Sequence, residues 1–528
     1  MSITSLVFLL FVFCTLTVYY IIPKKFQWAV LLAASLVFYI VSSTWGIFFV
    51  LITSLTTYGA ALLMTAVRQK QKAYVKENKD ALSKEEKKAV KETANKKRKR
   101  IMITTLILNF GILCVFKYSH FAVDQINHLL SLFNGPALNN TFSLISVLGL
   151  SFYTFQSMGY VVDVYWETVE LQKNYFKTLL FVSFFPQVTQ GPISDYTQLS
   201  GELFSEHSFT YESFSRGFQR MVWGFFKKMV IADYLAPFIA DAFQNYNQYT
   251  GVTCLLAAFG YSVQIYTDFS GYMDIMCGVC EMFGIQLAEN FERPYFSKSI
   301  AEYWRRWHIT LGAWFKKYIY YPIGVSKWNR ALGKKAGDKF GKFVGTNLPA
   351  TLALIVVWFV TGLWHGASWA YIAWGGVNGL FIIFSMWMEP VYEKVKSTLH
   401  IKSRSFLWRS FQTIRTFVLV TFIKVLPEVG TLRDGIGFWK RILTNRSIPQ
   451  GFSELIPYKS GKLELCILFF AVCLLFVFSV LQRKKNVREY FSRVPVFFRI
   501  CILVGIVMVI LIFGVANSGT GGFMYAQF

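Results

Sequence analysis

Residues 343–388 read FVGTNLPATLALIVVWFVTGLWHGASWAYIAWGGVNGLFIIFSMWM, and this run decides the fold. It contains no charged residue and is long enough for two helices that each cross a bilayer, which takes ~20 apolar residues. His365 lies near its middle, beside Gly362, Gly366 and Ala367, which leave room for a helix, a substrate or water. Because a histidine is costly to keep in hydrocarbon, it indicates function. The alternative is a structural histidine that bonds to a carbonyl of a neighbouring helix.

The whole chain has the composition of a membrane protein. Of its 528 residues, 54% are hydrophobic and 18% are aromatic, and the mean hydropathy is positive. The formal net charge is +25, but the Lys and Arg residues lie in loops between apolar runs, which is the positive-inside pattern of cytoplasmic loops. We therefore expect the lipid bilayer, with its anionic head groups, and no nucleic acid as the partner of these charges. The chain is expected in the plasma membrane with many passes.

Further apolar runs predict an all-α polytopic protein with about twelve to fourteen membrane segments. We expect a single integral membrane domain over residues 1–528. The other main predicted spans are residues 5–22, 28–41, 46–66, 101–117, 142–164, 223–238, 257–280, 411–425, 463–481 and 500–515.

The charged loops predict the orientation of these spans. Within the basic segment 67–100, residues 68–100 hold fourteen Lys/Arg against five Asp/Glu and no sustained apolar face, which predicts a solvated cytoplasmic loop, either helical or disordered. Lys227 and Lys228 are expected at a cytoplasmic edge. A second basic segment at 482–499 is also expected in the cytoplasm, so the tail 516–528 would lie outside.

The sequence PQVTQGP at residues 186–192 interrupts the apolar run 179–185. Two prolines and a glycine in seven residues do not continue a regular helix. Non-helical backbone at membrane depth is tolerated where protein covers it or where it lines a wet cavity. The segment therefore predicts either an internal chamber or an interfacial loop.

The eight cysteines predict neither a disulfide framework nor a metal site. They lie almost wholly within apolar segments, and Cys277 and Cys280 lack a second pair at metal-ligand spacing. We interpret them as small buried hydrophobic residues.

A second histidine, His308, lies in the sequence YWRRWHIT of residues 303–310. The surrounding residues 289–324 are too polar to cross a bilayer simply. Their mixture of Arg, Trp and Tyr predicts short helices at, or dipping into, the cytoplasmic half of the membrane.

Two carboxylates, Asp268 and Asp274, lie in the otherwise apolar span 257–280 and need partners there. The nearest rich source of cations in the sequence is Arg305 and Arg306. We expect a buried Asp–Arg pairing that holds the region of the second histidine. Direct proton transfer by either aspartate is the alternative.

Histidine among aromatic side chains in a membrane suits acyl transfer. A neutral His365 would take the proton of a hydroxyl that attacks an activated carbonyl, and general-base help of this kind contributes ~10²–10⁴-fold. Trp364 and its aromatic neighbours would exclude water, which competes with the hydroxyl. No Gly-rich phosphate loop and no serine nucleophile elbow occurs. A proton-coupled transporter would use the same residue types, so this chemistry leaves both functions open.

Six motifs in this order resemble the membrane-bound O-acyltransferase family, in particular its bacterial alginate O-acetyltransferase type. The resemblance covers residues 148–380, which we take as the family core, with weaker agreement on both flanks. The motifs are SFYTFQ at 151–156, SFFPQ at 183–187, DFSGY at 268–272, ENF at 289–291, YWRRWH at 303–308 and GLWHG at 362–366.

The resemblance implies both a fold and a site. The fold would be a ring of transmembrane and re-entrant helices around a thin core, with a cytoplasmic entrance for the donor and an outer funnel for the acceptor. His365 would be the catalytic histidine and His308 the second signature histidine. No metal or bound cofactor is implied, since the acyl thioester, acetyl-CoA or an acylated carrier protein, is a substrate. The candidate substrate-binding residues are Trp304, Arg305, Trp364, Asp268 and Asp274.

The sequence departs from the family pattern at two places. Lys316 and Lys317 stand where relatives usually carry Arg-Asp, and Asn378 stands where many alginate-type members have a further histidine. We therefore assign none of these positions a catalytic role.

The C-terminal residues FMYAQF at 523–528 carry a second resemblance. They resemble the Phe-x-Tyr-x-x-Phe ending of the small membrane partner in teichoic-acid D-alanylation, in which the tyrosine is thought to carry the acyl group. This implies a hypothesis in which Tyr525 is an acyl relay on the acceptor side. The alternative is an aromatic anchor at the outer interface.

We therefore predict an O-acetyltransferase that modifies an extracytoplasmic polysaccharide. D-alanyl transfer toward teichoic acid is the nearest alternative, and a proton-coupled transporter or flippase is the alternative from another class. A surface esterase-like partner that completes the transfer is compatible with either acylation.

Overall fold

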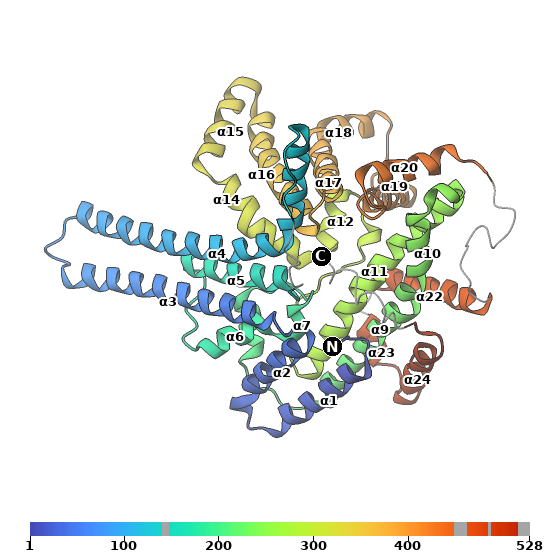
Figure 1. The fold of residues 1–528 in the computed structure, drawn as a ribbon, viewed down its shortest axis with the longest axis horizontal. Helices are drawn as coiled ribbons and strands as arrows, with labels where there is room; N and C mark the ends of the chain where they lie inside the picture. The colour runs from blue at the N-terminus through green and yellow to red at the C-terminus, as the bar shows by residue number, and fades with distance from the viewer. Residues whose placement is uncertain (140–146, 448–461, 484–486, 516–528) are drawn as a thin grey trace. The chain divides into compact units, whose positions relative to one another are not determined.

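The computed structural model describes residues 1–139, 147–447, 462–483 and 487–515, and Figure 1 shows its ribbon. Within these ranges every regular element is a helix, and the one β contact found there is an isolated antiparallel bridge between Phe291 and Trp307. The prediction of an all-α chain is confirmed. The chain forms two compact units, which are described separately: Met1–Ser215 with Val279–Ala288, and Arg216–Gly278 with Glu289–Phe528.

Seven of the described helices are long and apolar enough to cross a membrane, and α1 (Leu6–Ile21) is a shorter apolar helix. These seven account for part of the predicted twelve to fourteen membrane segments, which also include re-entrant helices too short to cross. The predicted spans at 142–164, 223–238, 257–280 and 411–425 contain helices, but polar and charged side chains interrupt their apolar sequence. The seven are α2 (Gln27–Ser42) with the short η1 (Lys24–Phe26) before it, α3 (Ile47–Glu77), α4 (Lys84–Leu132), α16 (Lys342–His365), α17 (Trp369–Trp387), α22 (Lys462–Leu481) and α24 (Val496–Phe513).

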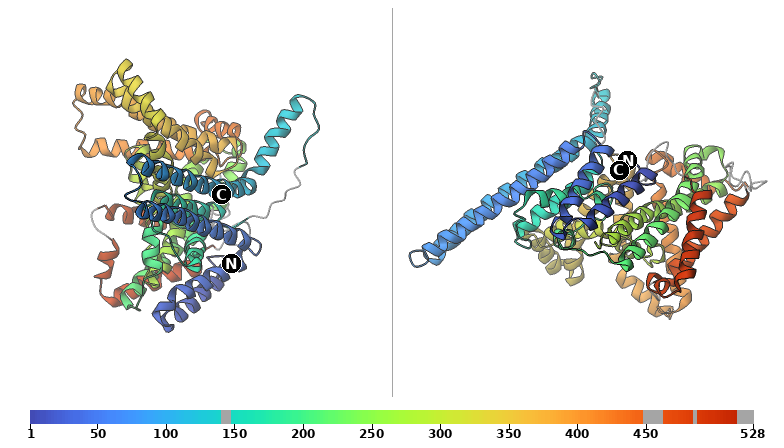
Figure 2. Two further views of the ribbon diagram at one scale, coloured as in Figure 1. Left: turned by 90° about the vertical axis from the view of Figure 1, so that its left-hand side faces the viewer. Right: turned by 90° about the horizontal axis from the view of Figure 1, so that it is seen from below.

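In the first unit, α3 and α4 form a long antiparallel hairpin (Figures 1 and 2). It contains the basic segment 67–100, so the helical alternative for that segment is confirmed. At the base of this basic part, buried Arg98 and partly exposed Arg68 both pair with Glu167, with N···O distances of 2.7 and 3.0 Å. Glu167 follows α5 (Leu150–Trp166), so these pairs join the hairpin to a third helix. Burial opposes the charged form of Glu167, yet the two arginines lower its pKa.

The predicted break after residues 179–185 is also confirmed. α6 (Tyr175–Ser183) ends there, and α7 (Phe185–Val188) adds only about one turn. Protein covers this backbone, since every residue from 178 to 194 is buried. Gly149, at φ 68°, permits a close approach, because a Cβ atom there would lie 1.7 Å from the carbonyl oxygen of Val188. The segment is therefore internal to the unit and is not an interfacial loop.

The other helices complete the two units. They are α8 (Tyr196–Leu203), α9 (Tyr211–Phe225), the π-helix η2 (Phe226–Ala232), α10 (Asp233–Gln244), η3 (Tyr246–Gln248), α11 (Gly251–Met282), η4 (Pro294–Phe296), α12 (Ile300–Arg306), α13 (Ile309–Phe315), the π-helix η5 (Lys316–Tyr320), α14 (Tyr321–Gly324), α15 (Lys327–Phe340), α18 (Glu389–Thr398), α19 (Phe406–Val425), α20 (Leu432–Thr444) and α23 (Val487–Ser492).

All eight cysteines are unpaired, and three of them (Cys254, Cys277 and Cys280) are buried as predicted, whereas the others face outward from their helices.

In the second unit, α9 and α11 approach each other at glycines. A Cβ atom added to Gly224 would lie 2.6 Å from the carbonyl oxygen of Gly271. One added to Gly278 would lie 2.5 Å from the carbonyl oxygen of Gly217. Small residues of this kind let the backbones of membrane helices come into contact. The close approach of α9 to α11 also places the acidic side chains of α11 near basic side chains of α9 and η2.

We expect Gly278→Ala to destabilise the protein by about 1–3 kcal/mol, because the added methyl group meets backbone that cannot rotate away. The measurement is the thermal unfolding midpoint of the full-length protein in detergent. Gly260→Ala on the same helix is the matched control, since its nearest neighbour would be an ordinary contact at 3.6 Å and alanine favours the helix. Equal midpoints for the two variants would contradict the close approach.

Candidate active site

His365 is the last residue of α16, directly before a tight connection to α17. Gly366 is extended, and Ser368 caps α17 by accepting a hydrogen bond from the backbone N–H of Tyr371. A Cβ atom on Gly366 would lie 2.1 Å from the Tyr371 ring. The prediction of two helices around a central histidine is confirmed, and glycine is required because the Tyr371 ring packs against the turn.

The ring of His365 has a defined tautomer. Its Nδ1 lies 2.8 Å from the carbonyl oxygen of Thr361, one turn earlier in α16. A carbonyl only accepts hydrogen bonds, so Nδ1 carries the proton of the neutral ring and Nε2 is the basic nitrogen. The side chain is only 4% exposed and packs against Trp364 and Trp374, with ring centroids 4.8 and 4.6 Å away. This bond is to the carbonyl of its own helix, so it orients the ring without tying it to a neighbouring helix.

His308 lies at the start of α13 in the left-handed conformation, with φ 47°. Asn290 holds this turn, because its Oδ1 accepts from the backbone N–H of Thr310 at 3.0 Å. The His308 ring is buried and packs edge-on against Phe269 at 4.9 Å and Trp364 at 5.9 Å. Trp364 therefore contacts both histidine rings, and the two signature histidines are brought together by one indole.

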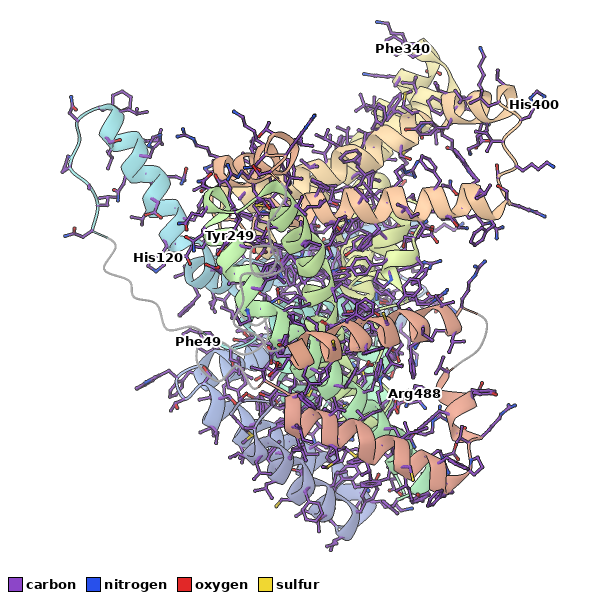
Figure 3. The ribbon with its side chains drawn as sticks, turned by 90° about the vertical axis from the view of Figure 1, so that its right-hand side faces the viewer. Phe49, His120, Tyr249, Phe340, His400 and Arg488 are labelled. Carbon is purple, nitrogen blue, oxygen red and sulfur yellow. The ribbon has the colours of Figure 1, made fainter. Side chains whose placement is uncertain are left out.

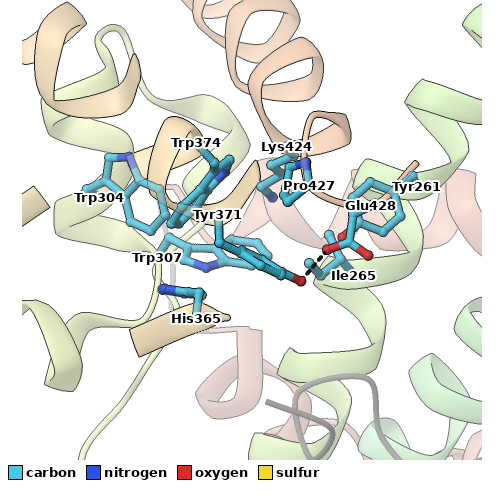
Figure 4. Close-up of a pocket in the computed structure, with 10 residues that line it drawn as sticks. All are labelled: Tyr261, Ile265, Trp304, Trp307, His365, Tyr371, Trp374, Lys424, Pro427 and Glu428. Carbon is cyan, nitrogen blue, oxygen red and sulfur yellow. Dashed lines mark hydrogen bonds between the residues drawn. The ribbon is translucent and has the colours of Figure 1, made fainter. Parts of the chain in front are cut away.

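A small pocket lies beside His365 (Figure 4). Aromatic rings form most of its wall, and a buried lysine and a glutamate complete it. Its lining residues are Tyr261, Ile265, Trp304, Trp307, His365, Tyr371, Trp374, Lys424, Pro427 and Glu428. Such a mixture of rings and a few polar groups is typical of a ligand site.

The histidines outside this region do not contribute to the pocket. His400, in the same unit, follows α18 and is exposed at its outer end (Figure 3). His120, His128 and His207 belong to the first unit. In the described part of the chain no group of three or more His, Cys, Asp and Glu side chains is arranged to hold a metal ion.

Lys424 and Glu428 are functional candidates that the sequence reasoning missed. The signal was present, since a lysine followed four residues later by a glutamate ends the apolar run of α19. Ionisable residues at membrane depth are rare and indicate function. The Glu428 carboxylate accepts a hydrogen bond from the Tyr371 hydroxyl at 3.0 Å (Figure 4) and another from Tyr261.

The aromatic candidates Trp304 and Trp364 lie at the site. Trp304 lines the pocket, and its Nε1–H donates to Oδ1 of buried Asn378 at 3.0 Å. Trp364 packs between the two histidines. Asn378, which departs from the family pattern, therefore holds the indole of Trp304. Arg305 is exposed on α12 and does not line the pocket.

The expected pairing of Asp268 and Asp274 with Arg305 and Arg306 is wrong. Arg306 pairs with Glu302 one turn away on α12, at 2.7 Å. Sequence proximity misled the prediction, since the cations that neutralise α11 come from α9 and η2, which precede it in the chain.

Asp274 pairs with Arg220 at 2.9 Å and with Lys227 at 2.6 Å, and Asp268 pairs with Lys228 at 2.6 Å. Lys227 and Lys228 are each 4% exposed, so both face the protein interior, and their position at a cytoplasmic edge stays a prediction. Both belong to the π-helix η2. Its extra residue per turn turns consecutive lysines inward, and π-bulges of this kind are frequent at functional sites.

Known proteins similar in sequence to this chain are membrane acyltransferases. Residues 172–335 match the model of the MBOAT, membrane-bound O-acyltransferase family. The probable alginate O-acetylase AlgI of Azotobacter vinelandii is 32% identical over 392 residues, which cover 72% of this chain and 68% of that protein. The probable alginate O-acetylase AlgI of Pseudomonas aeruginosa is 36% identical, over 54% of this chain and 51% of its own length. The peptidoglycan O-acetyltransferase of Helicobacter pylori is 30% identical, over 53% of this chain and 54% of its own length.

More distant similarity extends to teichoic acid D-alanyltransferases. The chain belongs to the membrane-bound O-acyltransferase family and is an O-acyltransferase enzyme. The proton-coupled transporter is thereby excluded as its class. Tyr525, which is predicted to be an acyl relay, lies outside the residues that the structure describes.

Proposed function

We propose that this enzyme transfers an acetyl group from a cytoplasmic thioester to hydroxyls of an extracytoplasmic polysaccharide. The observation that carries the proposal is His365, a buried histidine whose basic nitrogen is set by the Thr361 carbonyl and which lines an aromatic pocket. The names of the relatives support it, since alginate and peptidoglycan are both envelope or extracellular polysaccharides.

In the reaction, Nε2 of His365 takes the proton of the acceptor hydroxyl while the hydroxyl oxygen bonds to the thioester carbonyl carbon. The carbonyl π pair moves onto oxygen. Collapse of this intermediate breaks the C–S bond, and the leaving thiolate takes the proton back from His365. The products are a sugar ester and a free thiol. Trp304, Trp307 and Trp374 would keep bulk water from competing with the hydroxyl.

The donor is acetyl-CoA or an acylated carrier protein, which is consumed as a substrate, and the chain needs no bound cofactor for this step. The enzyme acts in the plasma membrane, and a surface esterase-like partner would pass the acyl group on to the glycan where the acceptor does not itself reach the site. The similarity to teichoic acid D-alanyltransferases favours D-alanyl transfer as the second candidate function.

Mass analysis of envelope glycans from cells with and without the gene tests the proposal. Ester-linked acetyl that disappears with the gene supports acetyl transfer, and loss of ester-linked D-alanine supports the alternative. Identical glycans in the two strains would contradict both.

The acyl relay adds a role for Tyr525 in the proposed function. Its hydroxyl would accept the acyl group at His365 and then pass it to the external glycan. On this basis Tyr525→Phe should lower glycan acetylation at least ~10²-fold, because phenylalanine retains the ring but cannot form the ester. Tyr490→Phe, at an exposed tyrosine of α23, is the matched control. Wild-type acetylation by Tyr525→Phe would rule out the relay and leave an interfacial anchor.

A further inference from the structure

Lys424 places a buried amino group inside an aromatic box. Its side chain is 5% exposed, and Nζ lies 3.6 Å from the ring centroid of Trp307. The rings of Tyr295 and Tyr303 lie 4.9 and 5.2 Å away. Cation–π contacts of this kind attract an ammonium group, and more strongly when it is desolvated. The box therefore holds Lys424 in a defined position beside the pocket.

The contacts of Lys424 leave donors of its amino group available to the pocket. In the part of the chain that the structure describes, its one hydrogen bond goes to the hydroxyl oxygen of Tyr295 at 2.9 Å, and it forms no ion pair. An ammonium group has three donors, so this bond uses one of them. Glu428 lines the same pocket, but it is bonded to the hydroxyls of Tyr371 and Tyr261.

The reaction of His365 requires such a group. When the hydroxyl attacks, negative charge develops on the carbonyl oxygen, and stabilising this oxyanion in a site without bulk water is usually the largest single contribution to catalysis. Two other donors of the pocket are already engaged, since the Trp304 N–H donates to Asn378 and the Tyr371 hydroxyl donates to Glu428. Lys424 is the one basic side chain besides His365 among the lining residues, and the two lie on different sides of the pocket (Figure 4).

We propose that Lys424 is a second catalytic residue, whose ammonium group donates a hydrogen bond to the oxyanion formed when the acceptor hydroxyl attacks the acyl thioester beside His365. The proposal rests on the proposed function. Lys424 takes no proton from the reaction. It stabilises the charge that the carbonyl oxygen gains, and the charge returns to the carbon–oxygen double bond when the C–S bond breaks. The box of Trp307, Tyr295 and Tyr303 holds the amino group in place, and Glu428 in the same pocket is bonded to Tyr371 and Tyr261.

The test uses cells that lack the gene and express wild-type protein, Lys424→Met, Lys424→Gln or Lys424→Arg. The readout is the initial rate at which labelled acetate appears as alkali-releasable acetyl on envelope polysaccharide, divided by the amount of the protein in the membrane. Lys424→Met retains the length and apolar contacts of the side chain but removes the charge, so the rate should fall ~10²–10³-fold. Lys424→Gln retains N–H donors without charge and should be intermediate. Lys424→Arg retains the charge and should exceed Lys424→Met at least tenfold.

Lys440→Met, at an exposed lysine of α20, is the control and should retain the wild-type rate. Thermal unfolding midpoints of the purified variants separate catalysis from folding. The inference is overturned if Lys424→Met retains a rate within about threefold of wild type, or if the three Lys424 rates follow their unfolding midpoints instead of their charge. If wild-type protein adds no ester-linked acetyl at all, the proposed function fails and the inference fails with it. If wild-type protein adds ester-linked acetyl and Lys424→Met adds it at the same rate, the role of Lys424 is wrong but the proposed function stands.

Discussion

Cells that carry His365→Gln in place of the wild-type chain should lose acyl transfer by ~10²–10⁴-fold, the usual contribution of a general base. Glutamine approximates the size of histidine and can still bond to the Thr361 carbonyl through its amide N–H, but it has no nitrogen that takes a proton at neutral pH. The loss should therefore appear in the rate of ester formation, with the protein still folded. Alkali-releasable acyl groups on envelope glycans, divided by membrane abundance, measure it.

His400→Gln is the control, since this exposed histidine follows α18 and does not line the pocket. It should leave the rate unchanged. A His365→Gln enzyme with wild-type turnover would show that another group takes the proton. His308→Gln would then be the next variant to measure, because its ring meets the same indole of Trp364.

Asp274→Asn should reduce stability by about 3–5 kcal/mol, the effect of breaking a buried ion pair at one partner. The carboxylate of Asp274 receives both Arg220 and Lys227, and these cations are 7% and 5% exposed at their side chains. Asparagine retains the shape but removes the charge that compensates them. The expected result is a lower yield of folded protein and a lower thermal unfolding midpoint in detergent.

Glu302→Gln is the matched control, because it breaks the more exposed pair with Arg306 on one short helix. Pairs of that kind contribute about 0–1 kcal/mol. The comparison also separates two roles of Asp274, which was predicted to bind substrate. An Asp274→Asn protein that unfolds at the wild-type midpoint but turns over slowly would support the substrate role over the structural one.

Much of the fold follows from local pattern. The uncharged run at 343–388 predicts two helices with His365 between them, and α16 and α17 meet there. The prolines near residue 190 predict the break after α6, and the structure has it. These features depend on apolar length and on backbone chemistry within a few residues, so the sequence contains all that is needed to predict them. Hydropathy alone does not distinguish a lipid-facing helix from one such as α5, which protein covers, so the number of membrane segments beyond the seven long apolar helices stays a prediction.

The candidate site divides in the same way. The motifs single out His365 and His308, but only the tertiary structure shows that Trp364 joins them. Pairing of charges was predicted from nearness in sequence and was wrong for Asp274, since its partners lie on α9 and η2. The sequence by itself determined a helical membrane acyltransferase and singled out His365 as its candidate catalytic residue. Only the packing of distant helices decided which charges are neutralised and that Lys424 faces the pocket, because these depend on side chains far apart in the chain meeting where water is absent.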